Sequence, residues 1–320
     1  LEMPHIILVE PAVNDQCNIG LDYITDGEAY RENMYWFYQL RIDGVNSNNK
    51  KYKQFTVGGS TDDVDLSKAH PLVKEKGGFG IECAVVEDEI KNQSWDLASK
   101  WKRAQEAAKN RAVVKQTITG PHMLSRFSVN NRLDLYKDDK ALAFAYSSCI
   151  KDEIEQLKNL GCERIQLDEP VLTEAPHECT WAADVINDIV DSFPTLHFSL
   201  HICGGNAHRK RGYFGKYQDM IDGLKKLKVH ELHLEHCTLH YDMLEVFDLY
   251  EYNGILSFGV IDQRSDELED VDTVHKRVEP VLEKFGSERI LLSSECGFGH
   301  VPIEITRAKL NRLVEAAKKY

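Results

Sequence analysis

Short apolar runs rich in β-branched residues alternate with helical patterns along most of the chain. This alternation is typical of parallel βα units, in which each strand is followed by a helix that crosses over the sheet. We therefore predict an α/β protein with the (β/α)8 TIM-barrel fold, which uses eight such units. The predicted strands cover residues 5–9, 22–26, 113–119, 164–169, 197–203, 231–236, 255–262 and 289–296.

The gap between the second and third predicted strands is far longer than a βα unit requires. We interpret residues 42–112 as an insertion with one hairpin-like piece, inside a single domain that spans residues 1–320. A lid and a contact between copies of the chain are both open as its role. The first predicted strand is the weakest of the eight, because only the short stretch 11–20 separates it from the second.

Charge and cysteine usage narrow the class of protein. The formal net charge is -13, from 39 Lys and Arg against 52 Asp and Glu. This excess argues against nucleic acid or a membrane surface as partner, because both require a cationic surface. The eight cysteines lack the spacing of a disulfide framework, which is typical of a reducing compartment, so we expect a cytoplasmic protein. We interpret the basic stretch 208–217 as a surface loop or as a loop beside an anionic substrate.

Polar side chains collect where the predicted strands end. In TIM barrels the chemistry takes place at the carboxyl ends of the strands, so these residues form the candidate site. Seven successive strand ends carry such a residue. The candidates are Asp26, Glu28, Thr119, Asp168, Glu169, His201, Cys203, Glu235, Asp262, Arg264 and Cys296.

Four of these candidates suit a metal ion. His201, Cys203, Glu235 and Cys296 offer an imidazole, two thiolates and a carboxylate, a set that favours zinc over magnesium or calcium. Taken singly, each cysteine could be a small buried hydrophobic residue and His201 a hydrogen-bonded strand end. Four together favour the metal site. His236 and Cys237 offer further donors, but side chains alternate along a strand, so we expect His236 to point toward the helices and keep Cys237 as a reserve ligand.

A zinc ion with two thiolate ligands can bind a substrate thiol and lower its pKa, which leaves a zinc-bound thiolate as the nucleophile near neutral pH. The ligand set therefore predicts alkylation of a thiol. We expect Glu235 to be the ligand that loosens, because a carboxylate oxygen suits a sulfur-rich zinc site least.

Seven stretches spread over residues 21–299 are distinctive in sequence and order. They are "LDYITDGEAYREN", "ITGPHMLSRFS", "RIQLDEPVL", "HICGGN", "LHLEH", "GVIDQRSDE" and "SSECGFG". In these stretches the chain resembles the cobalamin-independent methionine synthases, specifically their catalytic C-terminal barrel and its stand-alone relatives. The resemblance implies zinc-dependent transfer of a methyl group to a thiol, with homocysteine as the expected acceptor and His201, Cys203, Glu235 and Cys296 as the zinc ligands. The methyl donor would be a methylfolate or a methylcorrinoid.

The same resemblance implies roles in substrate binding. Glu28 and Asp168 match the carboxylates that grip the amino group of homocysteine, and paired carboxylates suit an ammonium group. Asp168 could instead cap the turn that begins at Pro170. Thr119 opens the "TGP" segment near the aromatic that stacks on a folate donor, and Phe127 stands where the family has tryptophan.

The chain departs from the family after the seventh strand. The family has a histidine two residues after the strand-seven aspartate; here Arg264 follows Asp262 at that distance. An arginine cannot shuttle protons, but it can hold a carboxylate, sulfonate or phosphate through two hydrogen bonds. We assign Asp262 and Arg264 to the catalytic site. The alternative function is a zinc-dependent thiol alkyltransferase or lyase that acts on an anionic thiol such as coenzyme M.

Two other classes stay open. A decarboxylase of the uroporphyrinogen type has a similar barrel but lacks this ligand set, and bound zinc would argue against it. A zinc-binding barrel without catalysis would hold the metal with four protein ligands and would not bind thiols.

Overall fold

A computed structural model gives the structure of the chain and describes residues 3–56, 78–239, 242–249 and 251–320. Its centre is a six-stranded parallel sheet in the order β5, β7, β8, β9, β10 and β11. At the β5 end, β1 (Tyr23–Ile24) pairs in parallel with β4 (Val113–Val114), which leads into β5 after one residue. The six strands are Gln116–Thr119, Arg164–Asp168, His197–Ile202, Glu231–Glu235, Ile255–Ile261 and Ile290–Ser294.

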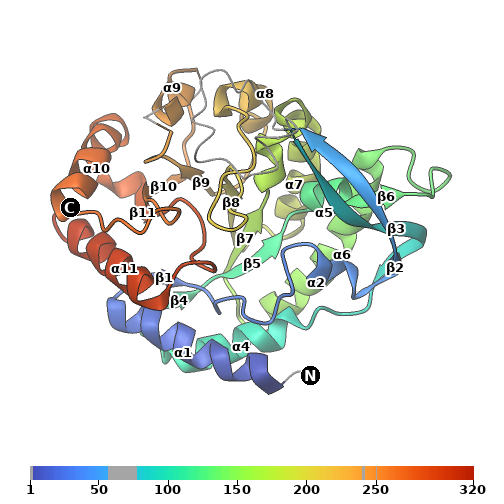
Figure 1. Cartoon of the computed structure of the whole chain (residues 1–320), viewed down its shortest axis with the longest axis horizontal. Helices are drawn as coiled ribbons and strands as arrows, with labels where there is room; N and C mark the ends of the chain where they lie inside the picture. Colours follow the sequence, from blue (N-terminus) through green and yellow to red (C-terminus); the bar gives the residue numbers. More distant parts are fainter. Residues whose placement is uncertain (1–2, 57–77, 240–241, 250) are drawn as a thin grey trace.

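Helices surround these strands, as Figure 1 shows. The central strands are buried on both faces, but only one face is apolar, because side chains alternate along a strand; the other face carries buried polar residues such as Ser199, His201 and His233. Leu200 of β8, Leu232 of β9 and Phe258 of β10 are all buried. The helices are α1 (Met3–Ile19), α2 (Trp36–Gln39), α4 (Leu97–Ala108), α5 (Pro121–Arg126), α6 (Asp139–Asn159), α7 (Cys179–Ser192), α8 (Ile221–Leu224), α9 (Asp242–Leu249), α10 (Val271–Phe285) and α11 (Ile303–Ala317).

The prediction of a strand over residues 5–9 is wrong, because this run lies inside α1. A short apolar run cannot be assigned to a strand or a helix by periodicity alone. The residues after this run show that it belongs to a helix: Val9 and Val13 are buried, and Cys17 packs against the same core. This interval of four residues is that of a helix, and α1 packs against α4 and α11. The other seven predicted strands are present.

The described strand pairs run from β1 round to β11 and do not include a pair between these two. Both strands line a cavity of about 480 Å³, together with Lys115 and the first residues of β7, β8 and β9, which are Arg164, His197 and Glu231. The cavity therefore lies at the amino ends of the strands, opposite the candidate site.

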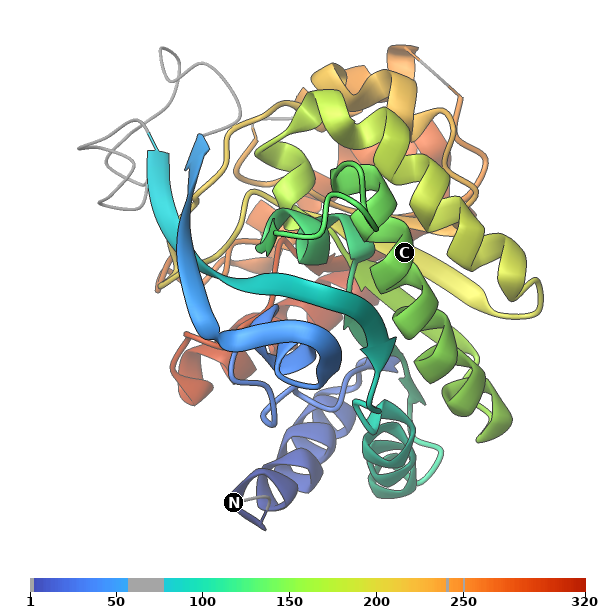
Figure 2. The same ribbon diagram turned by 90° about the vertical axis from the view of Figure 1, so that its right-hand side faces the viewer.

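The expected insertion at 42–112 contains a long antiparallel hairpin of β2 (Ile42–Thr56) and β3 (Gly78–Asn92). Residues 57–77 of the insertion lie outside the described residues. The hairpin continues into a three-stranded sheet because β3 pairs in parallel with β6 (Ser128–Asn130). Figure 2 shows it crossing one side of the barrel. The same range also holds α4, which packs beside α1 and α6, so the bounds of the insertion remain a prediction.

A buried ionic network fastens α5 and the hairpin to the segment after β7. Glu169 accepts hydrogen bonds from the backbone N–H groups of His122 and Met123, each at 2.8 Å, and so caps the helix. A Cβ at Gly120 would overlap the Glu169 carboxylate. The His122 ring is fully buried, and its Nε2 lies 2.8 Å from Glu178 Oε2. Helix α5 is therefore held by carboxylates from outside itself.

No helix in the described parts of the chain is long and apolar enough to cross a membrane.

We predict that His122 makes stability depend on pH. Burial acts to lower the pKa of His122, but the carboxylates of Glu169 and Glu178 outweigh it, so the pKa lies above the ordinary value of 6.5. A raised pKa in the folded state stabilises the protein fully below about pH 6.5, and this contribution is lost as the pH rises through the folded pKa. His122→Gln should lower the free energy of unfolding at pH 6 by about 1.5–3 kcal/mol, the worth of a hydrogen bond to a charged group.

Urea unfolding at pH 6 and pH 8 measures this effect. The difference between wild type and His122→Gln should be larger at pH 6 than at pH 8. His300→Gln is the control, because His300 is exposed and does not belong to the ion pairs of Glu169 or Glu178 found in the described residues. An equal difference at both pH values would contradict the assignment.

Candidate metal centre

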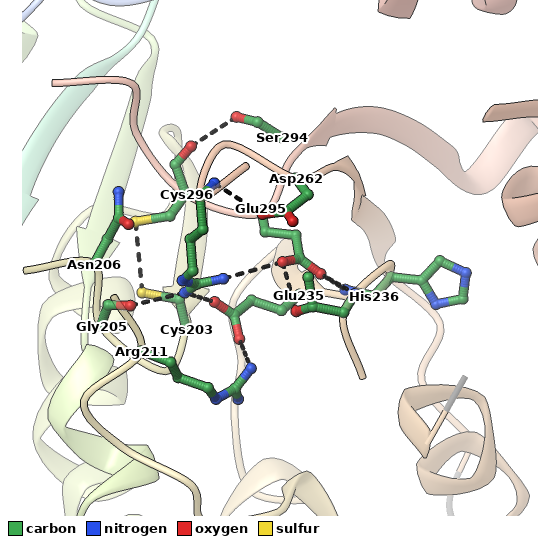
Figure 3. Close-up of polar contacts among 12 residues, drawn as sticks. Cys203, Gly205, Asn206, Arg211, Glu235, His236, Asp262, Ser294, Glu295 and Cys296 are labelled. Atoms are coloured by element: carbon green, nitrogen blue, oxygen red, sulfur yellow. Dashed lines mark hydrogen bonds and ion pairs between the residues drawn. The ribbon is translucent and has the colours of Figure 1, made fainter. Parts of the chain in front are cut away.

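Three of the four predicted metal ligands meet at the carboxyl ends of the strands. His201 lies near the end of β8, Cys203 follows that strand, and Cys296 lies two residues beyond β11. Donor atoms of His201, Cys203 and Cys296 all lie within 4.8 Å of one another. The sulfur atoms of the two cysteines are 3.7 Å apart, and Figure 3 shows them facing each other. Parallel strands bring these residues together because all their carboxyl ends face the same way.

The electrostatics of the three donors suit a metal ion. The thiol of Cys203 and the imidazole of His201 hold the pKa of Cys296 well below its ordinary value. The pKa of Cys203 is raised well above normal by its hydrogen bond with Cys296 and by burial. Within the described structure, Nδ1 of His201 is buried and has no hydrogen-bond partner. Two sulfurs and one imidazole form a borderline-soft donor set, so the residues fit zinc.

The carboxylate of Glu235, the fourth predicted ligand, forms ion pairs with two arginines, but its Oε2 is buried and has no hydrogen-bond partner among the described residues. Glu235 is the last residue of β9 and is fully buried. Its Oε2 lies 2.7 Å from Nη1 of Arg211, and its Oε1 forms a short ion pair with Nη2 of Arg264. Burial acts to raise the pKa of Glu235, but the two arginines outweigh it and lower the pKa. Glu235 is not part of the donor group identified among the described residues.

The two predicted catalytic residues lie beside this ion pair. Asp262 follows β10, and its Oδ1 accepts a hydrogen bond of 2.8 Å from the backbone N–H of Arg264. The Arg264 guanidinium also contacts Glu295 Oε2 at 3.1 Å and donates to the carbonyl of Gly205 at 2.7 Å. Its guanidinium therefore contacts the end of β9 and the segments after β8 and β11, while its Nε is buried with no hydrogen-bond partner among the described residues.

Of the two further donors after β9, His236 lies as strand alternation predicts. His236 turns away from the sulfur atoms and its Nε2 lies 3.0 Å from the Arg277 carbonyl of α10. Cys237 donates its backbone N–H to Gly259 and is outside the donor group found in the described residues.

Glu28 and Asp168 lie beside the metal site. The Glu28 carboxylate is 3.2 Å from Nη1 of the buried Arg31 and accepts a short hydrogen bond from Thr117. Asp168 accepts a 2.7 Å hydrogen bond from Gln166. Burial, followed by the nearby charge of Glu28, raises the pKa of Asp168 to about 6, and the charge of His201 opposes this rise. The two predicted ammonium-binding carboxylates and the metal donors thus share one region.

Two predicted substrate-binding residues make structural contacts. The hydroxyl of Thr119 donates to the Met34 carbonyl at 2.6 Å, and its backbone N–H donates to Tyr38. Phe127 is 2% exposed and packs edge to face against Tyr35 and Phe55. A contact with substrate remains a prediction for both.

Sequence reasoning missed three residues of this region. Arg211 lies in the basic stretch that we interpreted as a surface loop or as a loop beside an anionic substrate, and its side chain is only 11% exposed. Glu295 directly precedes Cys296 in "SSEC", and burial raises its pKa to about 7. The ring of His233 lies 4.3 Å from that of His201, and burial lowers its pKa well below 6.5. His233 could have been predicted from the sequence, because strand alternation turns its side chain to the same face as that of Glu235.

Comparison with known proteins identifies the family to which the chain belongs. Residues 73–319 match the sequence model of the cobalamin-independent synthase, catalytic domain. The chain belongs to this family. It is therefore an enzyme of the methionine synthase kind, as the sequence motifs predict.

Individual relatives and solved structures agree with this family. The chain is 27% identical over 307 residues to a methionine synthase of Saccharolobus islandicus (strain L.S.2.15 / Lassen #1), and the aligned region covers 96% of this chain and 81% of the relative. It is 28% identical to that of Sulfolobus acidocaldarius, with 96% and 79% covered. A B12-independent methionine synthase structure from Shewanella sp. W3-18-1 has a TM-score of 0.81 at 18% identity and covers 98% and 87%. This likeness confirms the TIM-barrel class.

We predict that His201, Cys203 and Cys296 bind one zinc ion per chain. His201→Ala, Cys203→Ser and Cys296→Ser should each weaken zinc binding by more than about ten-fold, the loss typical of outer-shell partners alone. Competition with a chromophoric chelator measures the affinity. Cys237→Ser is the matched control and should bind zinc as the wild type does. If Cys237→Ser instead loses the metal, the reserve donor belongs in the site.

Proposed function

We propose that the chain catalyses zinc-dependent transfer of a methyl group to the thiol of homocysteine. The observation that carries the proposal is the convergence of His201, Cys203 and Cys296 beside the paired carboxylates of Glu28 and Asp168. One part of the region suits a soft metal and the other suits an ammonium group. An amino-acid thiol matches both.

Zinc bound by these donors would lower the pKa of the acceptor thiol and present its sulfur as a nucleophile. The chain's own residues orient the acceptor. Glu28 and Asp168 offer carboxylate oxygens to its amino group through charge-assisted hydrogen bonds. Gln166 fixes the Asp168 carboxylate at 2.7 Å, and Arg31 fixes that of Glu28 at 3.2 Å. The ring of His233 packs against that of His201 at a centroid distance of 4.3 Å, and its Nε2 lies 2.9 Å from the Ser293 hydroxyl.

The alternative acceptor is an anionic thiol such as coenzyme M, which would need a free cation. Arg264 was the candidate, but its guanidinium contacts Glu235, Glu295 and the Gly205 carbonyl. Engagement with two carboxylates favours homocysteine over this alternative. A catalytic role for Asp262 and Arg264 would then be to position the loops around the metal. The relatives named above are methionine synthases, which also supports homocysteine. The methyl donor is a methylfolate or a methylcorrinoid.

X-ray absorption at the zinc edge tests the acceptor. We expect homocysteine to add one sulfur ligand to the zinc, and coenzyme M to add none. A gain of sulfur with coenzyme M alone would support the alternative. A protein that binds no zinc would contradict both functions.

We predict that Asp168 sets the affinity for the amino group of the acceptor. Asp168→Asn should raise KM for homocysteine about 10- to 100-fold, because one hydrogen bond to a charged group is worth about 1.5–3 kcal/mol. The carboxylate is the form that binds ammonium, so wild-type KM should also rise as the pH falls through about 6.

Steady-state kinetics between pH 5 and 8, at saturating methyl donor, measures both effects. The variant should lose the step near pH 6 while it keeps its zinc content. Asp272→Asn on α10 is the control. An unchanged KM in the Asp168→Asn protein would show that the amino group binds elsewhere.

A further inference from the structure

The cavity at the amino ends of the strands has an unusual lining for the inside of a barrel. Its volume of about 480 Å³ lies within the range of small-molecule sites. The interior of a TIM barrel is normally packed with branched apolar side chains. Here the residue before β5 and the first residues of β7, β8 and β9 line the space, and all four are titratable. Asp22 and Lys318 also line it, but they are exposed and opposite in charge.

One side of the cavity holds more positive than negative charge. Glu231 is buried, and its Oε2 lies 3.4 Å from Nη1 of Arg164 and 3.2 Å from Nε2 of His197. Lys115 forms no ion pair among the described residues, and its Nζ donates to Oε1 of Gln166 at 2.6 Å. Burial lowers the pKa of Lys115, and the nearby charge of Glu231 opposes this shift. One carboxylate therefore serves two cations and a histidine, and the ammonium group of Lys115 has no anion in contact within the described structure.

The other side of the cavity is apolar and incompletely covered. It is formed by Leu291 and Leu292 of β11, Leu282 of α10 and Val314 of α11. All residues of β11 are only partly buried, whereas all those of β9 are buried. Apolar surface that stays in contact with water is unfavourable, so a ligand that covers this side gains affinity.

We propose that the cavity binds a small monocarboxylate with an apolar body, its carboxylate on Lys115 and its body against β11 and α11. A carboxylate accepts charge-assisted hydrogen bonds from an ammonium group, and the body removes the apolar side from water. A monoanion matches one unpaired ammonium group, whereas a phosphate dianion would leave excess negative charge beside Glu231. The site lies at the opposite end of the strands from the metal donors and is independent of the proposed function.

Isothermal titration calorimetry of the whole chain with octanoate tests the proposal. Acetate probes the carboxylate alone, and 1-octanol probes the apolar body alone. We expect one octanoate per chain, bound at least about ten-fold more tightly than either of the other two, because only octanoate satisfies both sides.

The variant Lys115→Met removes the charge and keeps an apolar stem. It should weaken octanoate about 10- to 100-fold, the loss expected for one hydrogen bond to a charged group, and change octanol binding by less than about three-fold. Lys102→Met is the matched control, because Lys102 is exposed on α4 and does not line the cavity. It removes the same charge and should bind octanoate as the wild type does.

The variant Ala317→Trp tests the place of binding. Ala317 is exposed on α11 and lines the cavity, so a large side chain there occupies the space without disturbing the core. This variant should lose both octanoate and octanol.

Three results would overturn the inference. The first is a wild-type protein that shows no saturable octanoate binding or that binds octanol equally well. The second is unchanged octanoate affinity in Lys115→Met, and the third is undiminished binding in Ala317→Trp, which would place the ligand elsewhere.

Discussion

The ion pairs of Glu235 with Arg211 and Arg264 join the loops around the metal donors. Glu235 ends β9, Arg211 comes from the loop after β8, and Arg264 comes from the loop after β10 and reaches Glu295 beyond β11. Buried charges need all their partners at once, so the loops after these four strands are fixed relative to one another. The positions of Cys203 and Cys296 follow from this arrangement, since each cysteine lies on one of the fixed loops.

Much of the site could be predicted because it depends on strand order. Once seven strands are assigned, the parallel arrangement places His201, Cys203 and Cys296 at one end of the barrel, and their side-chain chemistry indicates zinc. The arginines could not be predicted in the same way. Arg211 lies eight residues beyond Cys203 in a basic stretch, and only the path of the loop turns this one cation inward.

In the fold, too, local sequence patterns predict the regular strands, whereas packing between distant elements could not be predicted. Runs such as 197–203 and 231–236 alternate apolar and polar residues, and this period of two identifies them as strands. Residues 5–9 form only a short apolar run, and α1 is fixed by packing against α4 and α11, which no local pattern reports. The hairpin of β2 and β3 had a recognisable shape in the sequence, whereas its attachment to the barrel depends on contacts across more than a hundred residues.

That attachment makes the hairpin and α5 a single cooperative unit. Thr56 of β2 donates two hydrogen bonds to Glu174, Glu174 pairs with Arg126 of α5, and Arg126 pairs in turn with Glu178, the partner of His122. Local opening of a protein proceeds by such connected units. Amide protons of β2 and α5 should therefore exchange with solvent together, since ion pairs and hydrogen bonds connect the hairpin to the buried charge of His122 on α5.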